Sequence, residues 1–252
     1  WRRGCCCAAC GNGSGASTWA ETRSRLSLTH EMLTLVTPLT GTRAWARLPL
    51  VLGGVLLGVF LPTFFTTPER KLNWWLEVGP GVIGMVALAV TFKRFPMSKL
   101  IYVCVFVHIL ILAYGGYYTY AKAPLGEWAK EAFGWHRNNY DKIGHFAFGF
   151  FPVFTLREVL LRKTKLERGA WFVFILLSMI LGFAAFYEFI EWWGALALDP
   201  EGGDKFLGTQ GDVWDAQKDM ALASLGALLA MLVVALVQRL RGPIPLVVSE
   251  PL

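Results

Sequence analysis

Six long apolar runs, four of them without any charged residue, decide what this chain can fold into. Four of them hold 21, 22, 19 and 19 consecutive uncharged residues, between Arg47 and Glu69, Lys99 and Lys122, Arg168 and Glu188, and Asp219 and Arg239. A helix rises 1.5 Å per residue, so about 20 apolar residues cross the hydrocarbon core of a bilayer. Continuous apolar runs, without strict alternation, exclude a β-barrel. The pattern predicts membrane-spanning helices.

The expected fold class is all-α, an integral membrane bundle of six transmembrane helices. The fourth span is the weakest, because Arg157 and Glu158 lie within it near its end. There a long Arg side chain can reach the interface and the neighbouring Glu can partly compensate its charge. The predicted spans are about 48–67, 72–92, 100–121, 143–161, 169–190 and 219–238.

Composition agrees with a membrane protein. Hydrophobic residues make up 55% of the chain and charged residues 17%, against about 25% charged in soluble domains. This excludes a disordered chain and an ordinary soluble enzyme. The net charge of +6 comes without a basic helix or an RNA-binding pattern, so we expect the lipid bilayer as partner and no nucleic acid.

The two ends of the chain differ from the middle. Residues 1–31 are polar and without periodicity, and four of the five cysteines lie there without zinc-site spacing. We expect 1–31 to be a disordered or non-native extension before a natural start at Met32. Residues 32–241 are then the transmembrane domain, and 242–252 a short cytoplasmic tail.

The basic residues predict an orientation. One set of connections holds eleven Lys and Arg with almost no acid, including 93–99 and 162–168. The other set holds eight, diluted by eleven Asp and Glu. Because cytoplasmic loops carry the excess of Lys and Arg, we expect the first set, and both termini, in the cytoplasm of a bacterial inner membrane.

Ionisable residues gather at the predicted outer ends of spans four, five and six. Asp141 and His145 are four residues apart, so they share a helix face. A carboxylate beside a His can fix its tautomer and raise its basicity, as in general bases and metal ligands. The two are therefore candidate catalytic residues. The alternative is helix capping by Asn139 or Asp141.

Five further carboxylates belong to the same expected polar site. Glu188 and Glu191 are three apart on one face and repel each other unless a cation or a proton is shared. The other three are aspartates spaced by three and four residues, which share a helix face if the last helix begins near Asp212. The alternative interpretation is that they only cap the N-terminus of that helix. They are Asp212, Asp215 and Asp219.

A divalent cation is the candidate cofactor of this site. Oxygen-rich ligand sets suit Mg²⁺, Ca²⁺ or Mn²⁺, and one His with carboxylates also allows Zn²⁺. A proton-shared carboxylate network without metal is the open alternative. Lys142 is a further candidate member. We expect five of these side chains to meet in one buried site, namely His145, Glu188, Glu191, Asp215 and Asp219.

Several long motifs resemble a known family. FPMSKLIY, GGYYTYAKAPLG, RNNYDKIGHFAFGF, REVLLR, YEFIEWW and FLGTQGDVWDAQKDM are similar to YjdF-type bacterial inner-membrane proteins, a family of unknown function, over about Leu48 to Gln238. A weaker similarity links the DKxxHF pattern to VanZ-like membrane proteins, which carry a glutamate–glutamine pair where this chain has Glu188 and Glu191. The resemblance implies an integral membrane protein and no particular chemistry.

Two hypotheses about function stay open at this point. In the first, the carboxylates form a proton or cation relay in a small transporter or scaffold. In the second, the protein is a membrane enzyme, metal-assisted, that acts on a lipid or cell-envelope precursor. A cavity open sideways to lipid favours the enzyme, and a polar path inward past His108 favours transport. The substrate and the oligomeric state are not predictable from the sequence.

Overall fold

The computed structural model describes residues 42–68, 71–197, 207 and 209–242, and all regular structure in these ranges is helical. The expectations for residues 1–31 and for the tail from 243 onward lie outside the described residues. The helices, in chain order, are α2 (Thr42–Thr66), α3 (Lys71–Thr91), α4 (Lys99–Tyr118), the 3-10 turn η1 (Tyr120–Lys122), α5 (Pro124–Phe133), α6 (Tyr140–Phe150), α7 (Pro152–Lys163), α8 (Ala170–Ala197) and α10 (Asp215–Arg241).

Six helical segments are long and apolar enough to cross a membrane, which confirms the predicted fold class. The first three segments match the predicted spans to within three residues at each end, whereas the last three are longer because the helix continues beyond the predicted run. The segments are Arg47–Thr66, Lys71–Thr91, Lys99–Tyr118, Tyr140–Lys163, Ala170–Ala197 and Asp215–Leu240.

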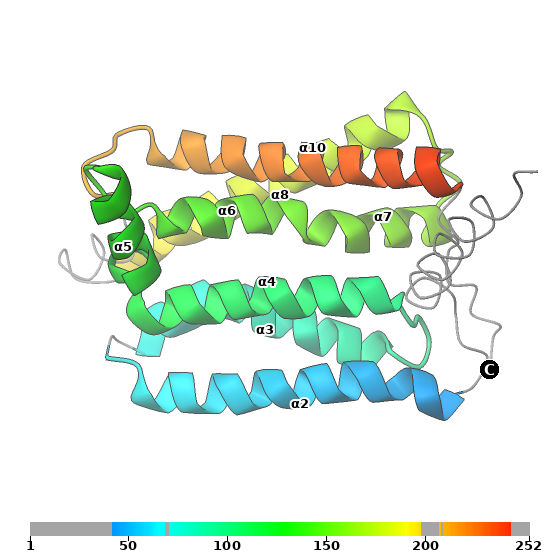
Figure 1. Cartoon of the computed structure of the whole chain (residues 1–252), viewed down its shortest axis with the longest axis horizontal. Coiled ribbons are helices and arrows are strands. Elements are labelled where there is room, and N and C mark those ends of the chain that lie inside the picture. The colour runs from blue at the N-terminus through cyan, green and yellow to red at the C-terminus, as the bar shows by residue number, and fades with distance from the viewer. Residues whose placement is uncertain (1–41, 69–70, 198–206, 208, 243–252) are drawn as a thin grey trace, which may run out of the picture. The chain divides into compact units, whose positions relative to one another are not determined.

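The helices between Thr42 and Arg241 form two groups that lie side by side (Figure 1). In one group, α2, α3 and α4 share an apolar core that includes Leu56, Trp74 and Ile109. In the other, α7, α8 and α10 share a core around Leu176 and Ala227. Helix α4 packs on α6 and α7 and joins the groups.

Helices α6 and α10 form the closest helix pair because small residues line their contact. A methyl group built on Gly149 would lie 1.8 Å from the carbonyl oxygen of Ala223, and one on Gly226 would lie 2.3 Å from that of Phe146. Small residues let transmembrane backbones approach in this way. The close approach fixes the start of α10 beside the start of α6.

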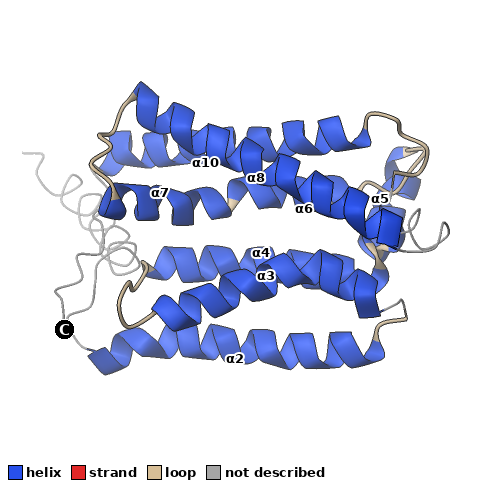
Figure 2. Ribbon diagram, turned by 180° about the vertical axis from the view of Figure 1, so that it is seen from behind, coloured by secondary structure: helices blue, strands red, loops and turns tan. Residues whose placement is uncertain are grey.

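The fourth span is broken into two helices that continue in one line (Figure 2). Helix α6 ends at Phe150 and α7 begins at Pro152, because proline has no N–H to continue the hydrogen-bond ladder. Arg157 and Glu158, the charged pair noted in the sequence of this span, are both buried. The partner of Glu158 is Arg162, one helical turn further along, whose Nη1 lies 2.8 Å from the carboxylate. The adjacent Arg157 is not its ion-pair partner.

Candidate functional site

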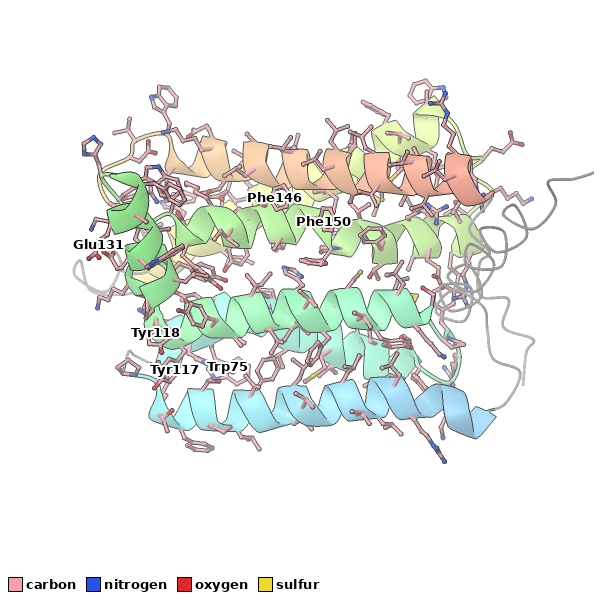
Figure 3. The ribbon with its side chains drawn as sticks, in the orientation of Figure 1. Trp75, Tyr117, Tyr118, Glu131, Phe146 and Phe150 are labelled. Atoms are coloured by element: carbon pink, nitrogen blue, oxygen red, sulfur yellow. The ribbon has the colours of Figure 1, made fainter. Side chains whose placement is uncertain are left out.

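One end of the bundle, here called the acidic end, carries α5, the last turns of α8 and the first turns of α6 and α10 (Figures 1 and 2). Helix α5 is short and amphipathic, and Glu131 lies exposed on it (Figure 3). The opposite end, the basic end, carries the connections after α3 and α7. The candidate residues lie at the acidic end.

Three aspartates and two cations form an ion-pair network, here called the aspartate network. Arg137 donates to Asp141 through Nη2 and to Asp215 through Nη1, both at 2.7 Å. Lys142 Nζ donates to Asp215 at 2.6 Å and to Asp219 at 2.8 Å. Asp219 is only 2% exposed. The two cations compensate most of the charge of the three carboxylates, so these aspartates are held within the protein.

A second group lies beside the network and lacks such compensation. His145, Glu188 and Glu191, here the His–Glu group, each offer one ligand atom, and these atoms lie within 4.8 Å of one another. His145 Nδ1 lies 3.8 Å from Glu188, and Nε2 lies 4.0 Å from Glu191 and 3.8 Å from Asp219. These separations are too long for hydrogen bonds.

Buried atoms of the His–Glu group therefore lack partners. His145 is 8% exposed, and no hydrogen bond joins its ring to another of the described residues. Glu188 Oε1 is buried without a hydrogen-bond partner. Among the described residues, no Lys or Arg nitrogen lies within ion-pair distance of Glu188 or Glu191. A buried carboxylate in this position favours a bound cation or a bound proton.

Asp212 does not share the helix face expected for it. Helix α10 begins at Asp215, because the preceding turn needs positive φ angles at Gln210 (49°) and Gly211 (87°). Asp212 instead accepts from the backbone N–H of Trp214 and from Lys218 Nζ. The Lys218 hydrogen bond and that backbone hydrogen bond hold the pKa of Asp212 below its ordinary value. It stays ionised at the surface, apart from the His–Glu group.

The structure adds residues that the sequence did not single out. Glu77 of α3, Tyr120 of η1 and Tyr187 of α8 line the same space as His145 and Glu191. Burial, together with nearby acidic and phenolic groups, raises the pKa of Tyr120 well above its ordinary value, so it stays a neutral phenol. Arg137 appeared in the sequence only as the first residue of the motif RNNYDKIGHFAFGF, without an expected role. No spacing rule connects these residues, because they come from separate helices.

Gln210 fixes the loop that carries Arg137. Its side-chain oxygen accepts from the backbone N–H of Asn138 at 3.0 Å, and its side-chain nitrogen donates to the Asn138 carbonyl at 2.8 Å. Arg137 Nη1 also donates to the carbonyl of Thr209 at 3.0 Å. This reciprocal pairing joins the connection before α6 to the turn before α10. It holds the aspartate network in place from outside the spans.

A cavity of about 720 Å³ runs from the His–Glu group toward the basic end. Helices α3, α4, α6, α7 and α8 contribute to its wall. His108 lies at its middle and stacks on Phe151 at a ring distance of 6.0 Å. Its Nε2 is buried without a hydrogen-bond partner.

Comparison with known proteins places the chain in a family. Residues 48–240 match the family described as "Predicted membrane protein (DUF2238)". The chain belongs to this family. It is 42% identical over 189 residues to "Inner membrane protein YjdF" of Escherichia coli (strain K12), which covers 74% of this chain and 90% of that protein. No solved structure matches.

The match also fixes the location of the chain at a coarse level. The relative is an inner-membrane protein by name, and this chain has six helices of membrane-spanning length. The family relationship inferred from the sequence motifs is confirmed, and the chain is a multi-pass protein of the inner membrane. The roles expected for His145, Asp141 and the carboxylates stay predictions.

Proposed function

We propose that the His–Glu group binds a divalent cation. The observation that carries the proposal is the unpartnered Glu188 Oε1 facing a His145 ring that itself makes no hydrogen bond to the described residues. The neighbouring aspartates have Arg137 and Lys142 as counter-charges. Two adjacent glutamates without such a counter-charge repel each other unless a cation lies between them.

The separations suit ligands of one ion. A Zn²⁺ ion lies about 2.0–2.2 Å from His nitrogen and carboxylate oxygen, so two ligand atoms are at most about 4.4 Å apart. His145 Nδ1 lies 3.8 Å from Glu188, within this limit. One ligand atom from each of the three residues lies within 4.8 Å of the other two, so small side-chain movements would bring all three to one ion. The imidazole nitrogen favours Zn²⁺ over Mg²⁺ and Ca²⁺, and Mn²⁺ suits the two carboxylates.

The function supported best is metal-assisted chemistry on a molecule that reaches the site through the cavity. His145 and Glu191 both line this cavity, so a bound cation would lie at its wall. Such a cation polarises an oxygen of the ligand or activates a water molecule. Asp141 and Asp219 also line this cavity, and the aspartate network to which they belong would position the His–Glu group. The reaction itself stays unassigned.

A proton relay is the rival function, and the same residues would serve it. Glu188 and Glu191 lie close enough for a side-chain hydrogen bond, which without a cation requires a shared proton. His108 Nε2 and Thr155 Oγ1, both without partners, lie along the cavity toward the basic end. Metal binding separates the two functions, since a relay of this kind needs no metal.

We also infer the orientation from charge. The basic end carries Lys93, Arg94 and the 162–168 connection, and cytoplasmic loops are rich in such residues. The acidic end, with the His–Glu group, would then face away from the cytoplasm. Both termini would lie on the cytoplasmic side.

Metal titration of the purified, detergent-solubilised protein tests the proposed site. We expect Mn²⁺ or Zn²⁺ to bind with a stoichiometry near one in isothermal titration calorimetry. Glu188→Gln and Glu191→Gln should each weaken binding by about tenfold or more, because each removes a charged ligand. Glu131→Gln removes the same charge from the exposed face of α5 and should leave binding unchanged.

Two results would overturn the cation proposal. One is an absence of metal binding by folded protein across neutral pH, which would leave the shared-proton relay. The other is an equal loss of binding in Glu131→Gln and Glu188→Gln, which would indicate diffuse attraction to an acidic surface instead of ligation.

A further inference from the structure

The cavity is polar at one end, apolar in the middle and basic at the other end. Glu77, Tyr120 and His145 line it at the acidic end, and Phe148 and Phe151 line its middle. Near the basic end it is lined by Arg94, Phe95 and Lys163. It therefore extends along most of the length of the spans. Its volume of about 720 Å³ lies within the usual 300–1,000 Å³ of ligand sites.

The cavity reaches the lipid-facing surface between α3 and α8. Val90 and Phe183 line it, yet their side chains are 76% and 47% exposed. Along α3 the wall includes the small residues Gly81, Gly84 and Ala87, and a methyl group built on Gly84 would meet nothing within 4 Å. At mid-membrane depth this surface faces acyl chains. A molecule dissolved in the bilayer can therefore enter sideways.

Two cations at the basic end lack carboxylate partners. Arg94 and Lys163 are exposed and line the cavity, and neither pairs with an acid among the described residues. Lys163 Nζ lies 4.8 Å from the ring of Phe95. Arg162 beside it is different, because its guanidinium is bound by Glu158 and by the Pro96 carbonyl. Two cations thus remain available at headgroup depth.

We propose that this cavity binds one anionic amphiphile from the bilayer. Its phosphate or carboxylate headgroup contacts Arg94 and Lys163, and its acyl chain lies along the apolar wall toward Phe151. Basic pockets between transmembrane helices recognise anionic lipid headgroups in this way. The opposite orientation brings the anion to the acidic end. There the five carboxylates of the aspartate network and the His–Glu group outweigh the charge of Arg137, Lys142 and one divalent cation, so the anion is repelled with or without that cation. The proposal does not depend on the cation at the His–Glu group.

Lysolipid binding tests the headgroup half of the proposal. The full-length protein in phosphatidylcholine nanodiscs is titrated with oleoyl-lysophosphatidic acid. A parallel titration uses the oleoyl lysolipid that carries a phosphocholine headgroup. We expect the phosphate monoester to bind more tightly. Arg94→Gln with Lys163→Gln should weaken it about tenfold or more, on the scale of roughly fivefold per basic residue near a headgroup. Lys165→Gln, at the same end but outside the cavity wall, should not.

A second pair of variants tests the apolar half. Gly84→Phe places a ring in the cavity without a backbone clash and should abolish binding of the phosphate monoester. Gly58→Phe makes the same change on α2, which does not line this cavity. A methyl group built on Gly58 also meets nothing within 4 Å, so this variant should retain binding. Inorganic phosphate at the same concentration should not compete, because the acyl chain contributes most of the binding energy.

Three results would overturn the proposal. The first is equal affinity for the two headgroups in the unaltered protein. The second is the same loss in Lys165→Gln as in the Arg94 and Lys163 variant, which indicates attraction to the whole basic surface. The third is full binding by Gly84→Phe when that variant shows the unfolding temperature of the unaltered protein.

Discussion

At the scale of single residues, Lys142 decides how the acidic end is held together. Its ammonium contacts Asp215 and Asp219 of α10 and lies 3.3 Å from Asp141 of its own helix. The Asp219 side chain is almost fully buried, at 3% exposure. Removing one partner of a buried ion pair leaves an uncompensated charge, which costs more than the pair itself contributes.

Replacing this lysine tests that role. Lys142→Met should lower the thermal unfolding midpoint by roughly 6–12 °C, from about 3 kcal/mol for one lost buried partner and about 2–4 °C per kcal/mol. Differential scanning fluorimetry in detergent measures the shift.

The matched control for Lys142 is Lys130→Gln. Lys130 pairs with Glu127 at 3.1 Å, but both side chains are more than a third exposed, and exposed pairs contribute under about 1 kcal/mol. We expect almost no shift. Equal shifts in the two variants would show that Lys142 is no more than a surface charge.

At the scale of elements, the α6–α10 contact aligns the site. Asp141 and His145 are on α6, and Asp215 and Asp219 are on α10, so the register of the two helices sets the distances between these side chains. Phe146 and Phe150 lie on α6 along this contact (Figure 3). Gly149 and Gly226 permit the close approach.

Gly149→Ala should therefore destabilise the protein, by about 1–3 kcal/mol as for other overpacked cores. The added methyl group would overlap the Ala223 carbonyl, and backbone cannot yield as a flexible side chain can. Gly182→Ala in α8 is the control, because nothing lies within 4 Å of its new methyl group; we expect it to be neutral or slightly stabilising through helix propensity. Unfolding midpoints of the two variants, measured side by side, decide the matter. A neutral Gly149→Ala would mean that the two helices pack less closely than described.

At the scale of the whole molecule, the two ends of the bundle carry opposite charge and different sites. The His–Glu group and the aspartate network lie at the acidic end, whereas Arg94 and Lys163 lie at the basic end of the same cavity. A bilayer aligns this polarity across the membrane. The proposed cation and the proposed headgroup would thus be bound at opposite faces.

The orientation is tested by labelling single cysteines in intact cells. In a chain whose five native cysteines are replaced, Glu131→Cys reports on α5 at the acidic end and Lys165→Cys on the basic end; both positions are exposed. A membrane-impermeant maleimide should label Glu131→Cys directly and Lys165→Cys only after permeabilisation. The reverse pattern would invert the topology.

The sequence by itself determined the six spans, because crossing a bilayer requires about 20 consecutive apolar residues and this requirement is local. It also placed His145, Glu188, Glu191, Asp215 and Asp219 near the ends of their spans, since the cost of a charge in lipid depends on its position along the run. These properties need no knowledge of neighbouring helices.

The tertiary structure alone decided which charges are compensated. Arg137 and Lys142 could have paired with the glutamates of α8 or with the aspartates of α10, and only the α6–α10 contact selects the aspartates. It likewise decided that Asp212 stays outside the helix and that a cavity joins His145 to Arg94. These outcomes depend on distances between helices far apart in the chain, and helix spacing within one segment carries no information about them.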